Sequence, residues 1–186
     1  MKRSELTSED QLTRLLRVKG CNAWNEVVDY VRNLPYGRNA SRTDLSQVLT
    51  SERGTCSSKH ALLKEVADRN KITEVELILA IYKMTVDNTP GIGDYISAAG
   101  LEYLPEAHCY LKVDGKRIDC TSTTSDIQRL ESAIIQELVI KPEQVGQYKV
   151  NYHKTFIEQW LAENDLGQTP EEIWMIREKC IEELSR

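Results

Sequence analysis

Long apolar runs are missing from this 186-residue sequence, and so is an excess of positive charge. No run approaches the ~20 apolar residues that a helix needs to cross a bilayer. Acidic residues outnumber basic ones by 29 to 24, which argues against a phosphate backbone as a partner. Residues 1–10 contain Lys2 and Arg3 but no apolar stretch after them, which predicts no signal peptide and a cytoplasmic protein. We therefore expect neither a membrane nor a nucleic acid as a partner.

The cysteines lack the number and spacing of a disulfide framework or a zinc site. Five cysteines are present, and an odd count in a cytoplasmic chain disfavours a framework of disulfides. The sequence contains no Cys-x-x-Cys pair, which argues against structural zinc. Gly91 and Gly93 lack the third glycine and the following helix pattern of a nucleotide-binding loop. We therefore expect no metal and no cofactor.

The composition is that of an ordinary globular chain, with 40% hydrophobic and 28% charged residues. The length predicts a single domain over residues 1–186, whose last part, about 150–186, is helical. Apolar periodicity and cap residues predict an α+β fold: helices before and around one cysteine, then an antiparallel sheet, then two C-terminal helices. The expected helices are 8–19, 22–33, 44–50, 55–70, 151–164 and 170–184. The expected strands begin near residues 75, 108 and 116, and residues 133–140 are either another strand or a helix-to-strand transition.

The stretch around Cys56 has the pattern of a helix that begins at a reactive thiol. Gly54 precedes the cysteine, and apolar residues follow at helical spacing from Ala61 to Ala67. The first turn of a helix offers unpaired backbone N–H groups and the positive end of the helix dipole. A thiolate is stabilised there, and we expect the pKa of the Cys56 thiol to fall from about 8.5 toward neutrality. Cys56 is therefore a candidate nucleophile.

A β-hairpin is predicted around Asp114-Gly115, the strongest short hairpin signal in the chain. A two-residue turn pairs Val113 with Lys116 and Leu111 with Ile118. Continued outward, the register pairs Cys109 with Cys120 and His108 with Thr121. His108 and Asp119 then become diagonal neighbours on one face of the sheet. A carboxylate beside an imidazole sets its tautomer and raises its basicity, as a thiol nucleophile requires.

In combination, these motifs resemble the transglutaminase-like superfamily of papain-like cysteine hydrolases, over roughly residues 25–125. The matching pieces are Tyr36, Gly54-Thr55-Cys56, Ala61-Leu62-Leu63, His108, and Asp119-Cys120-Thr121. The resemblance implies Cys56 as nucleophile, His108 as general base and then acid, and Asp119 as the orienting carboxylate. It implies a thiol-dependent acyl hydrolase or transferase that acts on an amide bond, of the peptide or glutamine type, in a peptide or protein. The family often has an aromatic residue where this chain has Ser57.

The oxyanion that forms during acyl transfer needs hydrogen-bond donors. The backbone N–H of Cys56 is one natural donor. The second donor should come from a side chain upstream, and Asn39 and Tyr36 are the candidates.

Three other interpretations of these residues compete with this one. The chain could be a catalytically silent peptide-binding module on the same fold, gripping a peptide with the long loop 87–106. Cys109 and Cys120 could form a redox pair, although reduced core packing is the simpler expectation. His60 lies one helical turn after Cys56 and could compete as the base; without an evident acid beside it, we expect a packed or solvent-facing residue. His153 is expected on the surface.

Overall fold

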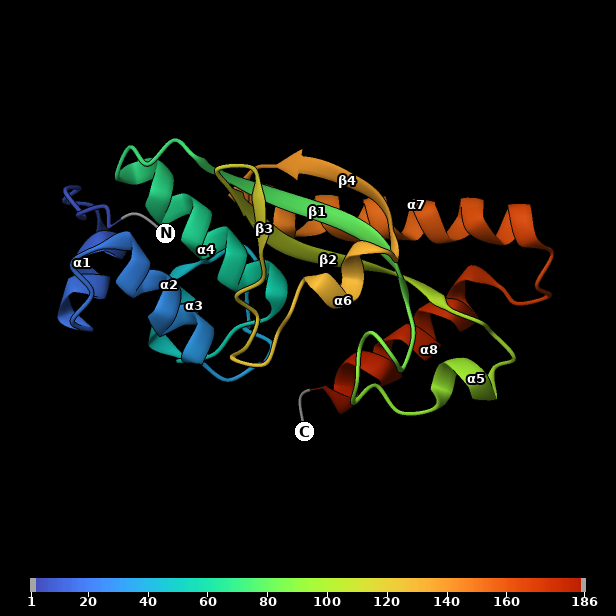
Figure 1. Cartoon of the computed structure of the whole chain (residues 1–186). Helices are drawn as coiled ribbons and strands as arrows, with labels where there is room; N and C mark the ends of the chain where they lie inside the picture. Colours follow the sequence, from blue (N-terminus) through green and yellow to red (C-terminus); the bar gives the residue numbers. More distant parts are fainter. Residues whose placement is uncertain (1–2, 185–186) are drawn as a thin grey trace. The chain divides into compact units, whose positions relative to one another are not determined.

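The computed structural model describes residues 3–184 and has the mixed α+β architecture expected from the sequence (Figure 1). The elements are α1 (Gln11–Val18), α2 (Trp24–Asn33), α3 (Ser46–Thr50), α4 (Cys56–Arg69), β1 (Val75–Met84), α5 (Tyr95–Ala98), β2 (Leu104–Val113), β3 (Lys116–Ile118), α6 (Gln128–Glu131), β4 (Ile134–Ile140), the 3-10 helix η1 (Pro142–Val145), α7 (Gln147–Asn164) and α8 (Pro170–Glu183). In residues 3–184, no helix has both the length and the apolar character that crossing a bilayer requires.

The strands form an antiparallel sheet in the order β3-β2-β1-β4. The predicted hairpin turn is confirmed: Asp114 and Gly115 both have positive φ, 49° and 75°, as a two-residue turn between twisted strands requires. The inner register is confirmed as well, because Leu111 pairs with Ile118 and Val113 with Lys116.

The predicted outer part of the hairpin is wrong. Strand β3 ends at Ile118, so the ladder does not continue to the expected pairs Cys109–Cys120 and His108–Thr121. Competing hydrogen bonds explain this end: the Cys120 N–H donates to His60, and the Thr121 carbonyl accepts from Lys59, both on α4.

The chain divides into two compact units, each built from separate stretches of sequence. The first unit comprises the chain up to Ile78, with Cys109–Ile127 and Val139–Gly146. The second comprises Leu79–His108, Gln128–Leu138 and the chain from Gln147 onward. Strands β1, β2 and β4 therefore contribute residues to both units. Cys56 and Asp119 belong to the first unit, and His108 belongs to the second.

Helix α4 is the centre of the first unit, where it packs against α2 and α3 (Figure 1). It also packs against η1. Its apolar face is fully buried from Ala61 to Leu63 and again at Val66. The indole Nε1 of Trp24 on α2 donates to the Leu63 carbonyl at 3.1 Å. This bond satisfies the polar atom of a buried tryptophan, as such side chains require, and it ties α2 to the middle of α4.

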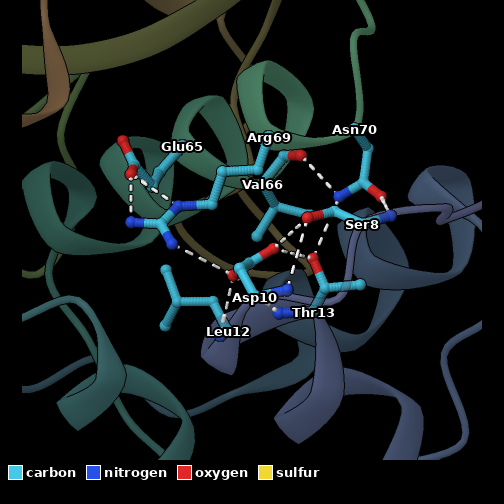
Figure 2. A network of polar contacts seen from close by, with 8 residues as sticks. All are labelled: Ser8, Asp10, Leu12, Thr13, Glu65, Val66, Arg69 and Asn70. Carbon is cyan, nitrogen blue, oxygen red and sulfur yellow. Dashed lines mark hydrogen bonds and ion pairs between the residues drawn. The ribbon is translucent and has the colours of Figure 1, made fainter.

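Helix α1 begins at Gln11, three residues later than predicted, and Asp10 caps it. The Asp10 carboxylate accepts the backbone N–H groups of Leu12 and Thr13, at 2.9 and 3.2 Å. The Ser8 hydroxyl donates to the same carboxylate at 2.7 Å. A carboxylate accepts the N–H groups of a first helical turn with favourable charge, so Asp10 takes the cap and Ser8 supports it (Figure 2).

In the second unit, α7 packs against α8, and α8 packs against α5. Helix α7 begins at Gln147, four residues before the predicted start, so His153 lies within its second turn. The prediction that His153 is a surface residue is wrong: it is buried, its Nε2 donates to the Pro105 carbonyl at 2.7 Å, and its ring contacts that of Trp174. Burial lowers the pKa of His153.

Candidate active site

Cys56 is the first residue of α4, as the sequence predicted. Thr55 caps the helix, with its hydroxyl accepting the Ser58 N–H at 3.3 Å, while the Ser58 hydroxyl accepts the Thr55 N–H at 3.0 Å. This reciprocal pair satisfies two donors at the helix start. The half-buried Cys56 thiol therefore sits on a rigid first turn, at the positive end of the helix dipole.

Gly54 allows two other segments to approach the start of α4. Its N–H donates to the Pro35 carbonyl and its carbonyl accepts the Gly37 N–H, both at 3.2 Å. Tyr36 thus forms a parallel bridge with Gly54, two residues before Cys56. A Cβ on Gly54 would lie 2.9 Å from the Lys59 Cγ, closer than such atoms can pack, so the glycine leaves room for the Lys59 side chain.

Asn39 organises the chain that leads to Cys56. Its Nδ2 donates to the carbonyls of Gln47 and Arg53, at 3.3 and 3.0 Å. Its Oδ1 accepts the Ser58 hydroxyl at 3.1 Å. Both amide hydrogens of Asn39 are therefore used to hold the loop around α3 against the first turn of α4.

His60 is fully buried and joins α4 to the segment after β3. Its Nδ1 lies 2.7 Å from the Cys56 carbonyl, and its Nε2 accepts the Cys120 N–H at 2.7 Å. A carbonyl can only accept and an N–H can only donate, so the ring is a neutral imidazole with its proton on Nδ1. The same Nε2 lies 3.6 Å from an Asp119 oxygen. The sequence interpretation missed this acid beside His60.

Lys59 is a site residue that the sequence interpretation did not single out. Its side chain is fully buried, and its Nζ donates to the Leu34 carbonyl at 2.5 Å and to the Thr121 carbonyl at 2.6 Å. Burial lowers the pKa of Lys59 to about 8, against the opposing charges of Cys120, Asp119 and Cys56. The signal that could have found it is position: Lys59 lies three residues after Cys56, on the same helical face.

The segment Asp119–Thr121 is fastened to the helices of the first unit. The buried carboxylate of Asp119 accepts the Thr121 N–H at 2.8 Å. From α2, the Arg32 Nη2 donates to the Cys120 sulfur at 3.6 Å. Burial raises the pKa of the Cys120 thiol to about 11, so this thiol stays protonated at neutral pH.

His108 lies on β2 in the second unit and is half-buried. The edge-to-face neighbour of its ring is Tyr82 on β1, with centroids 6.1 Å apart at 75°. The Tyr82 hydroxyl is itself hydrogen-bonded to the Thr89 hydroxyl at 2.9 Å. Two residues before His108 on β2, the Glu106 carboxylate accepts two hydrogen bonds from the Arg177 guanidinium of α8, at 2.7 and 2.8 Å. These contacts link the His108 ring to β1 and its strand to α8, within the second unit.

Of the predicted site residues, the first unit brings together Cys56, Asp119, Tyr36 and Asn39 around the start of α4. The role of His108 as base for Cys56 stays a prediction. Among residues 3–184, no cluster of three or more His, Cys, Asp or Glu side chains is arranged to hold a metal ion. Comparison with known proteins gives no match to a family model, to a curated protein or to a solved structure.

Proposed function

We propose that the chain is a thiol-dependent acyl hydrolase or acyltransferase that acts on an amide bond of a peptide or protein. Cys56 is the nucleophile, His108 the general base and then acid, and Asp119 the orienting carboxylate. The observation that carries the proposal is the construction of α4: one helix presents Cys56 at its first turn and binds the Asp119 segment through Lys59 and His60. A reactive thiol and a buried carboxylate on one rigid framework are typical of preorganised nucleophilic catalysis.

The chemistry proceeds in two steps. His108 takes the proton of the Cys56 thiol, and the sulfur attacks the amide carbonyl carbon to give a tetrahedral oxyanion. Collapse breaks the C–N bond, His108 gives its proton to the leaving amine, and a thioester remains. Water then releases a carboxylic acid, or a second amine forms a new amide, and the thiol is restored.

Tyr36 is the better candidate for the second oxyanion donor. The Tyr36 backbone pairs with Gly54, two residues before the nucleophile, which places this residue beside the start of α4. The backbone N–H of Cys56 supplies the first donor. Because the cysteines are present as thiols, we also propose a reducing compartment, the cytoplasm, as the location.

The first test measures the rate at which iodoacetamide alkylates Cys56 across pH, with peptide mapping to identify the modified residue. The wild type should react at Cys56 with a midpoint well below that of an ordinary thiol, and His108→Ala should raise that midpoint. His153→Gln, a matched change at a histidine of α7, should leave it in place. An ordinary midpoint in the wild type, unmoved by His108→Ala, overturns the mechanism.

The second test measures turnover. A library of glutamine-containing peptides is incubated with hydroxylamine, and both hydroxamate and free acid are quantified. Turnover that Cys56→Ala abolishes supports the proposal and removes the silent peptide-binding alternative. Peptide binding without any turnover favours that alternative and overturns the enzyme.

A further inference from the structure

The Lys59 side chain is placed unusually for a lysine. It begins on the first turn of α4, passes over Gly54, and ends with its ammonium between two backbone carbonyls, at 2.5 Å from Leu34 and 2.6 Å from Thr121. No part of it is exposed to solvent. Removing an ammonium from water is costly unless nearby negative charge compensates, so its surroundings should carry that charge.

The groups that face Lys59 supply it. Cys56 lies three residues earlier on α4, hence on the same face of the helix. Asp119 and Cys120 face it from the segment after β3, and the negative forms of all three groups favour its ammonium. From α2, the Arg32 guanidinium contacts the Cys120 sulfur, and this thiol is protonated at neutral pH. Asp119, and the Cys56 thiolate once it forms, are therefore the negative charges that can balance Lys59.

The two carbonyls that Lys59 binds belong to two chain segments that carry other predicted site residues. Leu34 directly precedes Pro35, and the Pro35 carbonyl accepts the Gly54 N–H. Thr121 lies two residues after Asp119, and its carbonyl accepts from Lys59. One ammonium thus joins the nucleophile helix to the chain that carries Tyr36 and to the chain that carries Asp119. An uncharged hydrogen-bond donor could close this junction, but it would bring no positive charge toward Cys56.

We propose that Lys59 is a positioning residue of the catalytic site, whose buried ammonium stabilises the Cys56 thiolate and holds the Asp119 segment against α4. The proposal rests on the proposed function, in which Cys56 is the nucleophile. The stabilisation of the thiolate is present while Lys59 is charged, and it is lost as the pH rises through about 8, the pKa of Lys59. Above that pH, a neutral Lys59 no longer favours the thiolate.

The test is the pH profile of Cys56 alkylation by iodoacetamide in Lys59→Met, with Lys64→Met as the matched control. Lys64 lies on the same helix and pairs with Asp68. Lys59→Met should move the midpoint up by about one pH unit, which lowers the rate about tenfold at pH values well below both midpoints. Lys59→Arg keeps the charge and should recover most of the rate. Lys64→Met should match the wild type.

A second measurement leaves Lys59 unchanged, so it tests the coupling of Lys59 to Cys56 even if Lys59→Met fails to fold. By linkage, the charge of Cys56 must shift the titration of Lys59 as much as Lys59 shifts that of Cys56. The lysine Nζ resonances are titrated by NMR in the wild type and in Cys56→Ser. A buried lysine whose midpoint falls by about one unit in Cys56→Ser supports the proposal.

Failure of this inference is distinct from failure of the proposed function. If His108→Ala moves the Cys56 midpoint but Lys59→Met and the lysine titration show no coupling, the role of Lys59 is overturned and the enzyme stands. If the wild-type Cys56 titrates as an ordinary thiol, unmoved by His108→Ala, both are overturned.

Discussion

The His60 imidazole accepts the backbone N–H of Cys120 at 2.7 Å and at the same time bonds the Cys56 carbonyl at 2.7 Å. One fully buried ring therefore links the residue at the start of α4 to the residue directly after Asp119. Both nitrogens take part in these contacts, in the neutral form with the proton on Nδ1. His60 serves as a bridge between two segments of the candidate site, which is a different task from that of a proton-transferring base.

Replacing His60 by Phe should therefore destabilise the protein. The change removes both hydrogen bonds and leaves the Cys120 N–H buried without its partner, so we expect a loss of about 2–4 kcal/mol in the free energy of unfolding. Urea unfolding followed by circular dichroism measures it. His108→Phe is the comparison, because His108 is half-buried, and it should cost about 1 kcal/mol or less. Equal losses for the two variants would contradict the bridging role.

Gly54→Ala should disturb both stability and thiol reactivity. A methyl group on Gly54 would lie 2.9 Å from the Lys59 Cγ and from the Ser58 Oγ. These atoms belong to buried side chains near the backbone, so relieving the overlap should cost about 1–3 kcal/mol and displace the Lys59 ammonium. Urea unfolding and Cys56 alkylation at neutral pH give the two readouts, and both should fall.

Gly37→Ala is the control for that change. A methyl group there meets the Arg53 Cδ at 3.0 Å, and Arg53 is an exposed, flexible side chain that can move at little cost. Gly37→Ala should therefore lose clearly less stability than Gly54→Ala. If the two glycines tolerate alanine equally, close packing against Lys59 does not explain why Gly54 is a glycine.

Local signals explain the parts of the fold that the sequence predicted well. Thr55 caps α4 and Asp114-Gly115 forms the hairpin turn, and each acts on residues only a few positions away. Thr169 and Pro170 likewise start α8 at the predicted residue. Such signals depend on backbone conformation and on nearby hydrogen bonds, so they can be read directly from residue order.

The contacts that organise the candidate site could not be predicted in this way. His60 and Lys59 meet the segment after β3 across about 60 residues of sequence. A lysine and a histidine on a helix are usually exposed. Their spacing in the sequence also gives no indication that β3 ends at Ile118. The end of this strand depends on competition between β2 and the side chains of α4 for the same backbone groups, which only the folded chain decides.

Asp10 should contribute stability that depends on acid pH. Burial alone would raise the pKa of Asp10, but hydrogen bonds from Thr13 and Ser8 and the charge of Arg69 outweigh it and lower the pKa to about 2 (Figure 2). Because the folded pKa lies below the ordinary value near 3.9, the contribution is complete above about pH 5. It is lost as the pH falls from about 4 to 2.

The experiment compares the wild type with Asp10→Ala by urea unfolding at several pH values. At pH 7 the variant should be about 1–2 kcal/mol less stable, as expected for a lost helix cap. The difference should shrink below pH 4, where the wild-type carboxylate becomes protonated. Glu9→Ala is the control, since Glu9 is exposed, and it should change stability by less than about 0.5 kcal/mol. A difference that is constant from pH 7 to pH 2 would contradict this account.

In the buried ion pair of Glu106 with Arg177, removing one partner should cost more stability than removing both. Their side chains are only 6% and 12% exposed, and the charge of Arg177 outweighs burial to lower the pKa of Glu106 to about 2. Arg177→Met strands the carboxylate and should cost about 3–5 kcal/mol of unfolding free energy, whereas the double variant with Glu106→Gln should cost clearly less. Arg14→Met, which breaks an exposed pair with Glu9, should cost under about 1 kcal/mol. A double variant that is less stable than Arg177→Met alone would show that Glu106 matters for something other than its partner's charge.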